Sequence, residues 1–138
     1  MTDNLSQYLE YKLMDHSLGT TTYTKPTTVY IALFLSSSGL EQNCSTNFSE
    51  CTGGAYARQS ATFNACNTST GATDNAADIT FPTATNGNWG TITHLAVCDS
   101  STTNYLNVLW WGALTASKTV ASGDTFKINS GDLDLTLS

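Results

Sequence analysis

The chain has 138 residues, which is the length of a single domain. Charged residues make up only 12 % of it, the net charge is −6, and the five basic residues are scattered singly along the sequence. Binding to nucleic acid needs many Lys and Arg side chains against the phosphates, so the sequence predicts no nucleic-acid partner. Thr, Ser and Asn supply most of the polarity, and this composition favours β-structure.

The sequence contains no apolar run of membrane-spanning length, so we expect no membrane association. Its first residues lack the basic and then apolar pattern of a signal peptide. We therefore expect synthesis in the cytoplasm, where the four cysteines start out reduced.

One helix is predicted, over residues 3–18, with Asp3 as its N-cap. Gly19 stands where a left-handed residue commonly ends a helix. A helix this short is marginal alone, so its apolar stripe must pack against protein. Both its own β-domain and a neighbouring subunit can provide that surface, and we favour the neighbour. The stripe consists of Leu5, Leu9 and Leu13, widened by Tyr8 and Met14.

From residue 20 onward the apolar period changes to two, which indicates strands. Residues 28–35 are apolar on both faces and predict a central strand covered on both sides. Polar stretches at 36–54 and 64–75 are predicted to be loops. The further predicted strands are 56–63, 77–81, 90–99, 105–114, 118–121, 125–128 and 133–137.

These elements predict a mainly β fold, an antiparallel β-sandwich or jelly-roll-like domain with one N-terminal α-helix. We expect residues 1–19 to form a helical arm and residues 20–138 to form the sandwich, as one domain overall.

Two adjacent tryptophans, Trp110 and Trp111, lie in the predicted strand 105–114. Side chains alternate along a strand, so the two rings must point to opposite faces. One ring is expected in the core. The other is either buried under the helix or a loop, or exposed as an interface anchor or glycan platform. With Leu5, Leu9 and Leu13, this pair forms our candidate interface.

The cysteines, Cys44, Cys51, Cys66 and Cys98, contain no CxxC pair, so the spacing predicts no zinc site. Cys44 and Cys51 flank one polar loop and can form a disulfide there. Four reduced thiols, with Cys98 packed as a small hydrophobic residue, are the favoured alternative.

Nothing in the sequence indicates catalysis, a metal or a cofactor. His16 and His94 lie on different predicted elements, without the spacing of metal ligands or of a nucleophile and its base. The aspartates cluster in turns without the pattern of a calcium loop, so we expect them to bond the backbone of their own turns.

Several motifs together resemble the small virion proteins of tailed phages that are known as capsid decoration (cement) or tail-fibre proteins. The resemblance covers most of the chain from Leu5 onward, and this sequence departs from the family's pattern at residues 40–52 and in its cysteines. The motifs lie at 25–34 (KPTTVYIALF), 53–59 (GGAYARQ), 77–84 (ADITFPTA), 89–94 (WGTITH), 111–114 (WGAL) and 117–125 (SKTVASGDT).

The resemblance implies a β-sandwich subunit, a homotrimer, and no catalytic residues. From it we predict a structural virion protein that is made in the host cytoplasm. The first expectation is a decoration protein that binds the major capsid protein and stabilises the shell. The alternative is a tail, neck or fibre subunit, which can also bind host-surface glycan.

Overall fold

The computed structural model describes residues 2–43, 48–104 and 107–137. In these residues the fold is mainly β, with antiparallel strand pairs and a single helix, as the sequence predicted. The helix is too short and too polar to cross a membrane, and the described residues contain no other. The elements are β1 (Thr2–Leu5), α1 (Gln7–Ser17), β2 (Val29–Phe34), β3 (Gln59–Ala61), β4 (Ala72–Asp74), β5 (Ile79–Thr80), β6 (Gly90–Cys98), β7 (Val108–Val120), β8 (Lys127–Ile128) and β9 (Asp134–Thr136).

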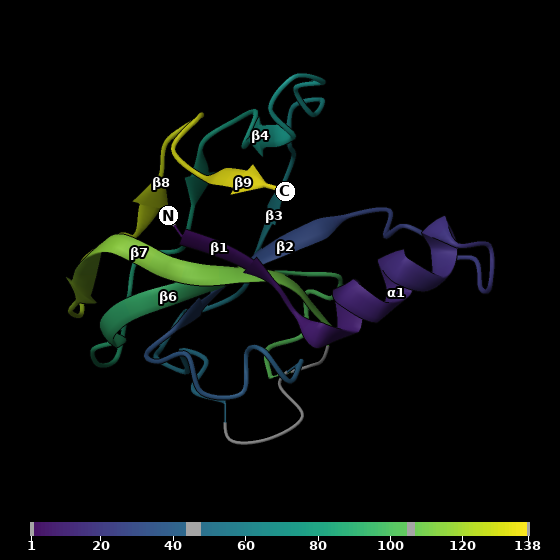
Figure 1. Ribbon diagram of the computed structural model, residues 1–138. Coiled ribbons are helices and arrows are strands. Elements are labelled where there is room, and N and C mark those ends of the chain that lie inside the picture. Colours follow the sequence, from purple (N-terminus) through teal and green to yellow (C-terminus); the bar gives the residue numbers. More distant parts are fainter. Residues whose placement is uncertain (1, 44–47, 105–106, 138) are drawn as a thin grey trace.

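The strands form two layers. Five of them make one sheet in the order β1-β7-β6-β2-β3, and the others pair as two short ladders, β4 with β9 and β5 with β8. The labelled ladder strands β4, β8 and β9 lie over one side of the larger sheet (Figure 1). Ladder residues such as Ile128 and Leu133 share one buried cluster with sheet residues such as Leu33 and Leu95. The layers therefore enclose a core as in a sandwich, while the jelly-roll-like connectivity stays a prediction.

Strand β2 shows why the central strand could be predicted. Ile31 and Leu33 face the core between the layers, whereas Ala32 and Phe34 belong to a second buried cluster on the opposite face. Leu40, from the segment after β2, helps to cover that second face. Side chains on both faces of β2 are thus buried, which explains its unbroken apolar sequence.

The N-terminal segment differs from the prediction, because the helix begins at Gln7 and not at Asp3. Ser6 is the N-cap, and its hydroxyl accepts a hydrogen bond from Leu9 N at 3.3 Å. Residues 2–5 form β1 instead, which pairs with β7 so that Leu5 lies opposite Trp110. Pairing with a long strand satisfies the backbone of residues 2–5 without a helix. The boundary between a helical arm and a sandwich at residue 19 stays a prediction.

The helix ends as predicted, with Gly19 in the left-handed region at φ +76°. Leu18 is the C-cap, and the backbone N–H of Gly19 donates to the carbonyl of His16.

Other strand boundaries also needed correction. The predicted strands 105–114 and 118–121 meet in one strand, β7, which runs from Val108 to Val120, while residues 105–106 lie outside the described residues. The register of β7 against β6 shifts between the pairs His94–Ala113 and Ile92–Lys118. This irregularity accommodates the exposed residues 115–117, where the sequence predicted a break. The predicted strand 56–63 shrinks to β3, and the predicted loop 64–75 contains β4.

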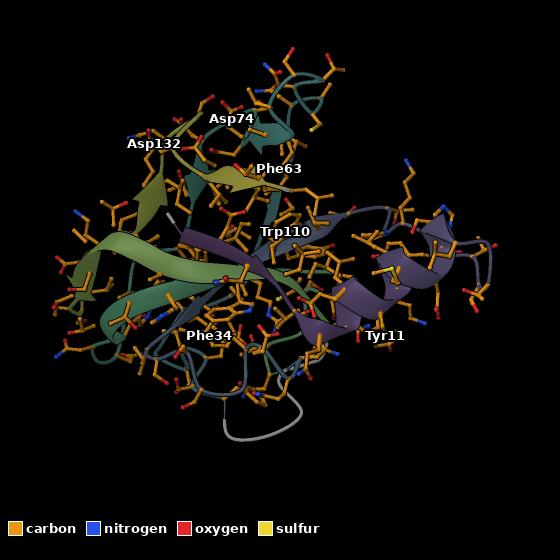
Figure 2. All side chains as sticks on the ribbon, in the orientation of Figure 1. Tyr11, Phe34, Phe63, Asp74, Trp110 and Asp132 are labelled. Carbon is orange, nitrogen blue, oxygen red and sulfur yellow. The ribbon has the colours of Figure 1, made fainter. Side chains whose placement is uncertain are left out.

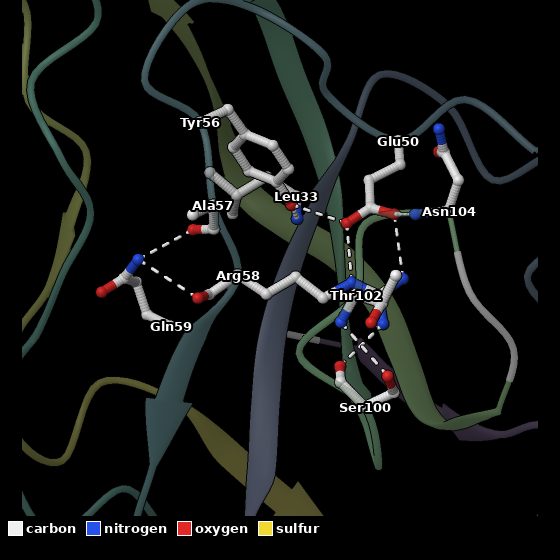
Figure 3. Close-up of polar contacts among 9 residues, drawn as sticks. All are labelled: Leu33, Glu50, Tyr56, Ala57, Arg58, Gln59, Ser100, Thr102 and Asn104. Atoms are coloured by element: carbon white, nitrogen blue, oxygen red, sulfur yellow. Dashed lines mark hydrogen bonds and ion pairs between the residues drawn. The ribbon is translucent and has the colours of Figure 1, made fainter.

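A buried ion pair holds the segment between β2 and β3 in place (Figure 3). Arg58 Nε lies 2.8 Å from Glu50 Oε1, and both side chains are fully buried. The same carboxylate accepts hydrogen bonds from Tyr56 Oη at 2.8 Å and from the backbone N–H of Asn104 at 2.6 Å. Arg58 Nη1 donates to the carbonyl of Ser100 at 2.9 Å. Each buried charge is therefore surrounded by partners, as burial of a charge requires.

Tyr56 connects this network to the sheet. Its hydroxyl accepts a hydrogen bond from the backbone N–H of Leu33 at 2.9 Å while it donates to Glu50. Burial, and then the neighbouring Glu50 carboxylate, raise the pKa of Tyr56 well above its ordinary value of 10.0. The hydroxyl therefore stays protonated and remains a donor to the carboxylate.

The two glycines before Tyr56 allow close packing. A Cβ atom on Gly53 would lie 2.1 Å from Trp89 Cδ1, and one on Gly54 would lie 1.9 Å from the carbonyl oxygen of Thr85. Trp89 Nε1 donates to the Gly54 carbonyl at 2.9 Å, and its ring meets Tyr56 edge to face at 5.4 Å. Motif residues that carry the family resemblance thus build the core.

We predict that Arg58→Met lowers the free energy of unfolding by about 3–5 kcal/mol, because it leaves the Glu50 carboxylate buried without its counter-ion. Urea denaturation measures the change. Lys127→Met is the control, because it removes an ion pair to Asp78 whose side chains are 45 % and 51 % exposed, and solvent screening makes its loss much smaller than that of the buried pair. Equal losses in the two variants would contradict the prediction.

Candidate functional site

An apolar cleft lies between α1 and the two layers, and we call it the α1 cleft. Its volume is about 310 Å³. Leu9 and Leu13 line it from the helix, Trp110 from β7, Leu135 from β9, and Phe63 from the segment that follows β3. The cleft thus brings together three of the five predicted interface residues.

The remaining two predicted interface residues lie elsewhere. Leu5 is half-buried in β1, and Trp111 packs against the second buried cluster. The opposite orientation of the tryptophans is confirmed, because Trp110 packs against the core between the layers. Figure 2 shows Trp110 and Phe34 on opposite sides of the sheet.

Leu9 is covered by its own chain. Its side chain is only 5 % exposed in the single subunit, while Leu13 is half-buried. We expected either the chain's own domain or a neighbour to cover the stripe, and favoured the neighbour. For Leu9 the neighbour is not needed, because β1 carries the helix directly onto β7.

Trp111 is held under the segment that follows β2. Its Nε1 donates to Glu41 Oε2 at 3.0 Å, and its ring centroid lies 6.4 Å from that of His94. A half-buried ring with its N–H satisfied within the chain matches the predicted burial under a loop.

The two histidines are engaged separately. His94 Nδ1 lies 2.8 Å from Thr93 Oγ1, whereas His16 Nδ1 accepts a hydrogen bond from Tyr23 N at 3.0 Å. Among the described residues no group of three His, Cys, Asp or Glu side chains is placed to hold a metal ion. The expected bonding of turn aspartates within their own turns holds for Asp124, whose Oδ2 accepts a hydrogen bond from the Ala121 N–H at 2.9 Å. It is wrong for Asp78, whose Oδ1 accepts from the N–H of the distant Ser130 at 2.8 Å.

The cysteines have three different environments. Cys51 is buried, with its Sγ 4.0 Å from the Trp89 carbonyl oxygen, and burial raises the pKa of its thiol. Cys66 is exposed, and Cys98 packs in the second buried cluster as a small hydrophobic residue. Cys44 lies outside the described residues, so its disulfide with Cys51 stays a prediction.

The outer face of α1 was not predicted from the sequence. Met14 was expected in the same stripe as Leu9 and Leu13, but it is 60 % exposed and lies with Tyr11 and Leu18 on the opposite side of the helix. The spacing of these three residues, three and then four positions, was the available signal.

The described residues thus define a mainly β protein with one helix and an apolar cleft beside it. The chain belongs to the family described as Podophage GP4 fiber I protein gp80, whose model matches residues 4–136. It is therefore a structural protein of the tailed-phage virion. No curated protein matches the sequence.

We predict that Leu9→Ala lowers the free energy of unfolding by about 2–5 kcal/mol, since it empties a buried site between helix and sheet. Thermal or urea unfolding of the isolated subunit measures this cost. Leu13→Ala is the matched control at a half-buried position and should cost less. An unchanged stability of the Leu9 variant would contradict coverage by its own chain.

We also predict that His94 makes stability pH-dependent. Burial lowers the pKa of His94 below 6.5. The unfolded chain therefore binds this proton first, so stability is complete above about pH 6.5 and falls as the pH drops through the folded-state pKa. His94→Gln should lose less melting temperature than the wild type between about pH 7.5 and about pH 5. Identical losses would contradict the prediction.

Proposed function

We propose that the chain is a fibre subunit of a tailed phage, which corresponds to the alternative that the sequence raised. The observation that carries this proposal is the family match over residues 4–136 to a podophage fibre protein. The packing of the motif residues also supports membership of this family. A Cβ atom on Gly53 has no room beside the Trp89 ring, and Trp89 Nε1 donates a hydrogen bond to the Gly54 carbonyl, so these residues help to form the core.

Capsid decoration is the second candidate, and it was the first expectation from sequence. The observation that favours it is the short two-layer body, which has no repetitive shaft in its described residues. In that role the partner is the major capsid protein, and the subunit stabilises the shell as a homotrimer.

We infer that either role is mechanical and needs no catalysis or cofactor. Glu50, the fully buried carboxylate, is engaged by Arg58, Tyr56 and Asn104, which suits a structural group and not an acid or base that must exchange protons. Measurement of hydrolysis of host-surface polysaccharide by the purified protein tests this inference, and turnover would contradict it.

Cryo-electron microscopy of the virion distinguishes the two structural roles. Density for this chain on a fibre, with copies on the order of tens per particle, is the expected result. Density over the capsid surface, with copies on the order of hundreds, would overturn the fibre proposal and favour decoration.

A further inference from the structure

The loop before β6 contains the only asparagine of the sequence that is followed by glycine, Asn86 with Gly87. Both residues are exposed, and they lie between two buried residues, Ala84 and Trp89. Their φ angles are +53° and +124°, and a Cβ atom placed on Gly87 would meet nothing within 4 Å beyond its chain neighbours. The peptide bond that joins the two residues is therefore open to water and has room to rotate.

Asparagine is a thermolabile residue, because its side-chain amide reacts with its own main chain. The main-chain nitrogen of the next residue gives up its proton and bonds to the side-chain carbonyl carbon, which closes a succinimide ring. The side-chain carbon–nitrogen bond breaks, and its nitrogen leaves with that proton as ammonia. Water then adds to one of the two ring carbonyls and opens the ring, to aspartate or to isoaspartate. The reaction consumes only water, and it is fastest before glycine, which has no Cβ atom to shield the nitrogen.

The two reacting groups are free at this step of the chain. Among the described residues, neither the side-chain amide of Asn86 nor the N–H of Gly87 has a hydrogen-bond partner. The peptide bond between them can therefore rotate to bring the nitrogen onto the side-chain carbon without loss of a hydrogen bond. An attack that needs no bond to break first has a lower barrier.

Other asparagines are held back by their contacts. Asn88 lies in the same loop, but its Oδ1 accepts a hydrogen bond from Ser122 N at 2.9 Å, and the next residue is the buried Trp89. After Asn129 the attacking nitrogen itself is engaged, because the N–H of Ser130 donates to a carboxylate at 2.8 Å. Each of these residues must lose a hydrogen bond, and the barrier rises by the free energy of that bond.

The ends of the loop are fixed close to Asn86. Thr85 N donates to the Gly54 carbonyl at 3.2 Å, and Trp89 N donates to the Val120 carbonyl at 2.9 Å. In isoaspartate the main chain passes through the former side chain, so it is one atom longer between these two fixed points. The longer chain has to displace the loop from the core residues that it contacts.

We propose that Asn86 is a site of spontaneous deamidation, and that its isoaspartate product loosens the loop before β6. The reaction also adds a negative charge to a chain whose net charge is −6. The proposal goes beyond the structural role argued above, because it concerns how the subunit changes with age.

The test is incubation of the full chain at physiological temperature and mildly alkaline pH, followed by peptide mapping with mass spectrometry over time. Alkaline pH favours the reaction because the attacking nitrogen must give up its proton. Asn86 should be converted about tenfold faster than Asn88 or more, since Asn88 first has to lose a hydrogen bond. Both aspartate and isoaspartate should be found at position 86.

Two variants show that the products come from this site. Asn86→Ser removes the side-chain amide, so ion-exchange chromatography should no longer resolve the acidic form that builds up in the wild type. Asn88→Ser is the matched control in the same loop, and its acidic form should build up as in the wild type. Circular dichroism melting confirms that both variants are folded.

The melting temperature of the separated products tests the effect on the loop. The isoaspartate form should melt roughly 2–8 °C below the fresh protein. Asn86→Asp carries the same new charge on an ordinary main chain and should melt as the fresh wild type does. This comparison separates the longer main chain from the added charge.

Two results would overturn the proposal. The first is conversion of Asn86 that is no faster than that of Asn88, which would show that the site is not reactive in the folded chain. The second is an isoaspartate form that melts as the fresh protein does, which would show that the loop tolerates the longer main chain. Neither result bears on the position of the chain on the virion, so failure of this inference is distinct from failure of the proposed function.

Discussion

The ion pair between Glu50 and Arg58 is the contact on which the arrangement of the long connections depends. It joins the segment before β3 to the backbone at Ser100 and Asn104, and Tyr56 extends it to β2. A buried ion pair contributes little more to stability than apolar side chains of similar size. Any arrangement that separates its two charges inside the protein is strongly disfavoured. The network therefore selects one position for loops that have little regular structure of their own.

The sequence predicted the elements whose pattern is local. β2 and β6 were found because their apolar side chains alternate or fill both faces over several residues. The start of α1 was misplaced because Leu5 and Leu9 have helical spacing, although Leu5 belongs to a strand whose partner is Trp110. Three of the four ladder strands, β5, β8 and β9, lie inside predicted strands. β4 was missed, because three residues in a polar stretch leave almost no periodic signal.

For the α1 cleft too, the features with a local sequence pattern were predicted and the others were not. Leu9, Leu13 and Trp110 were predicted because apolar side chains on a helix and a strand must be covered, and the structure places them around one cleft. Lys118 and Lys127 line the same pocket because the chain reverses direction between β7 and β8. No local sequence pattern predicts this proximity. The same holds for the buried ion pair, whose members are separated by a glycine turn that carries no periodicity.

The pairing of β1 with β7 also orders events in time. Ser6 Oγ donates to the carbonyl of Val108, a partner 102 positions further along the chain. A nascent polypeptide leaving the ribosome cannot make this contact until β7 has been translated, and such distant pairing is slow. Until then α1 has no sheet to pack against, and an isolated helix of this length is marginal. The helix surface therefore matures late, after most of the subunit has been synthesised.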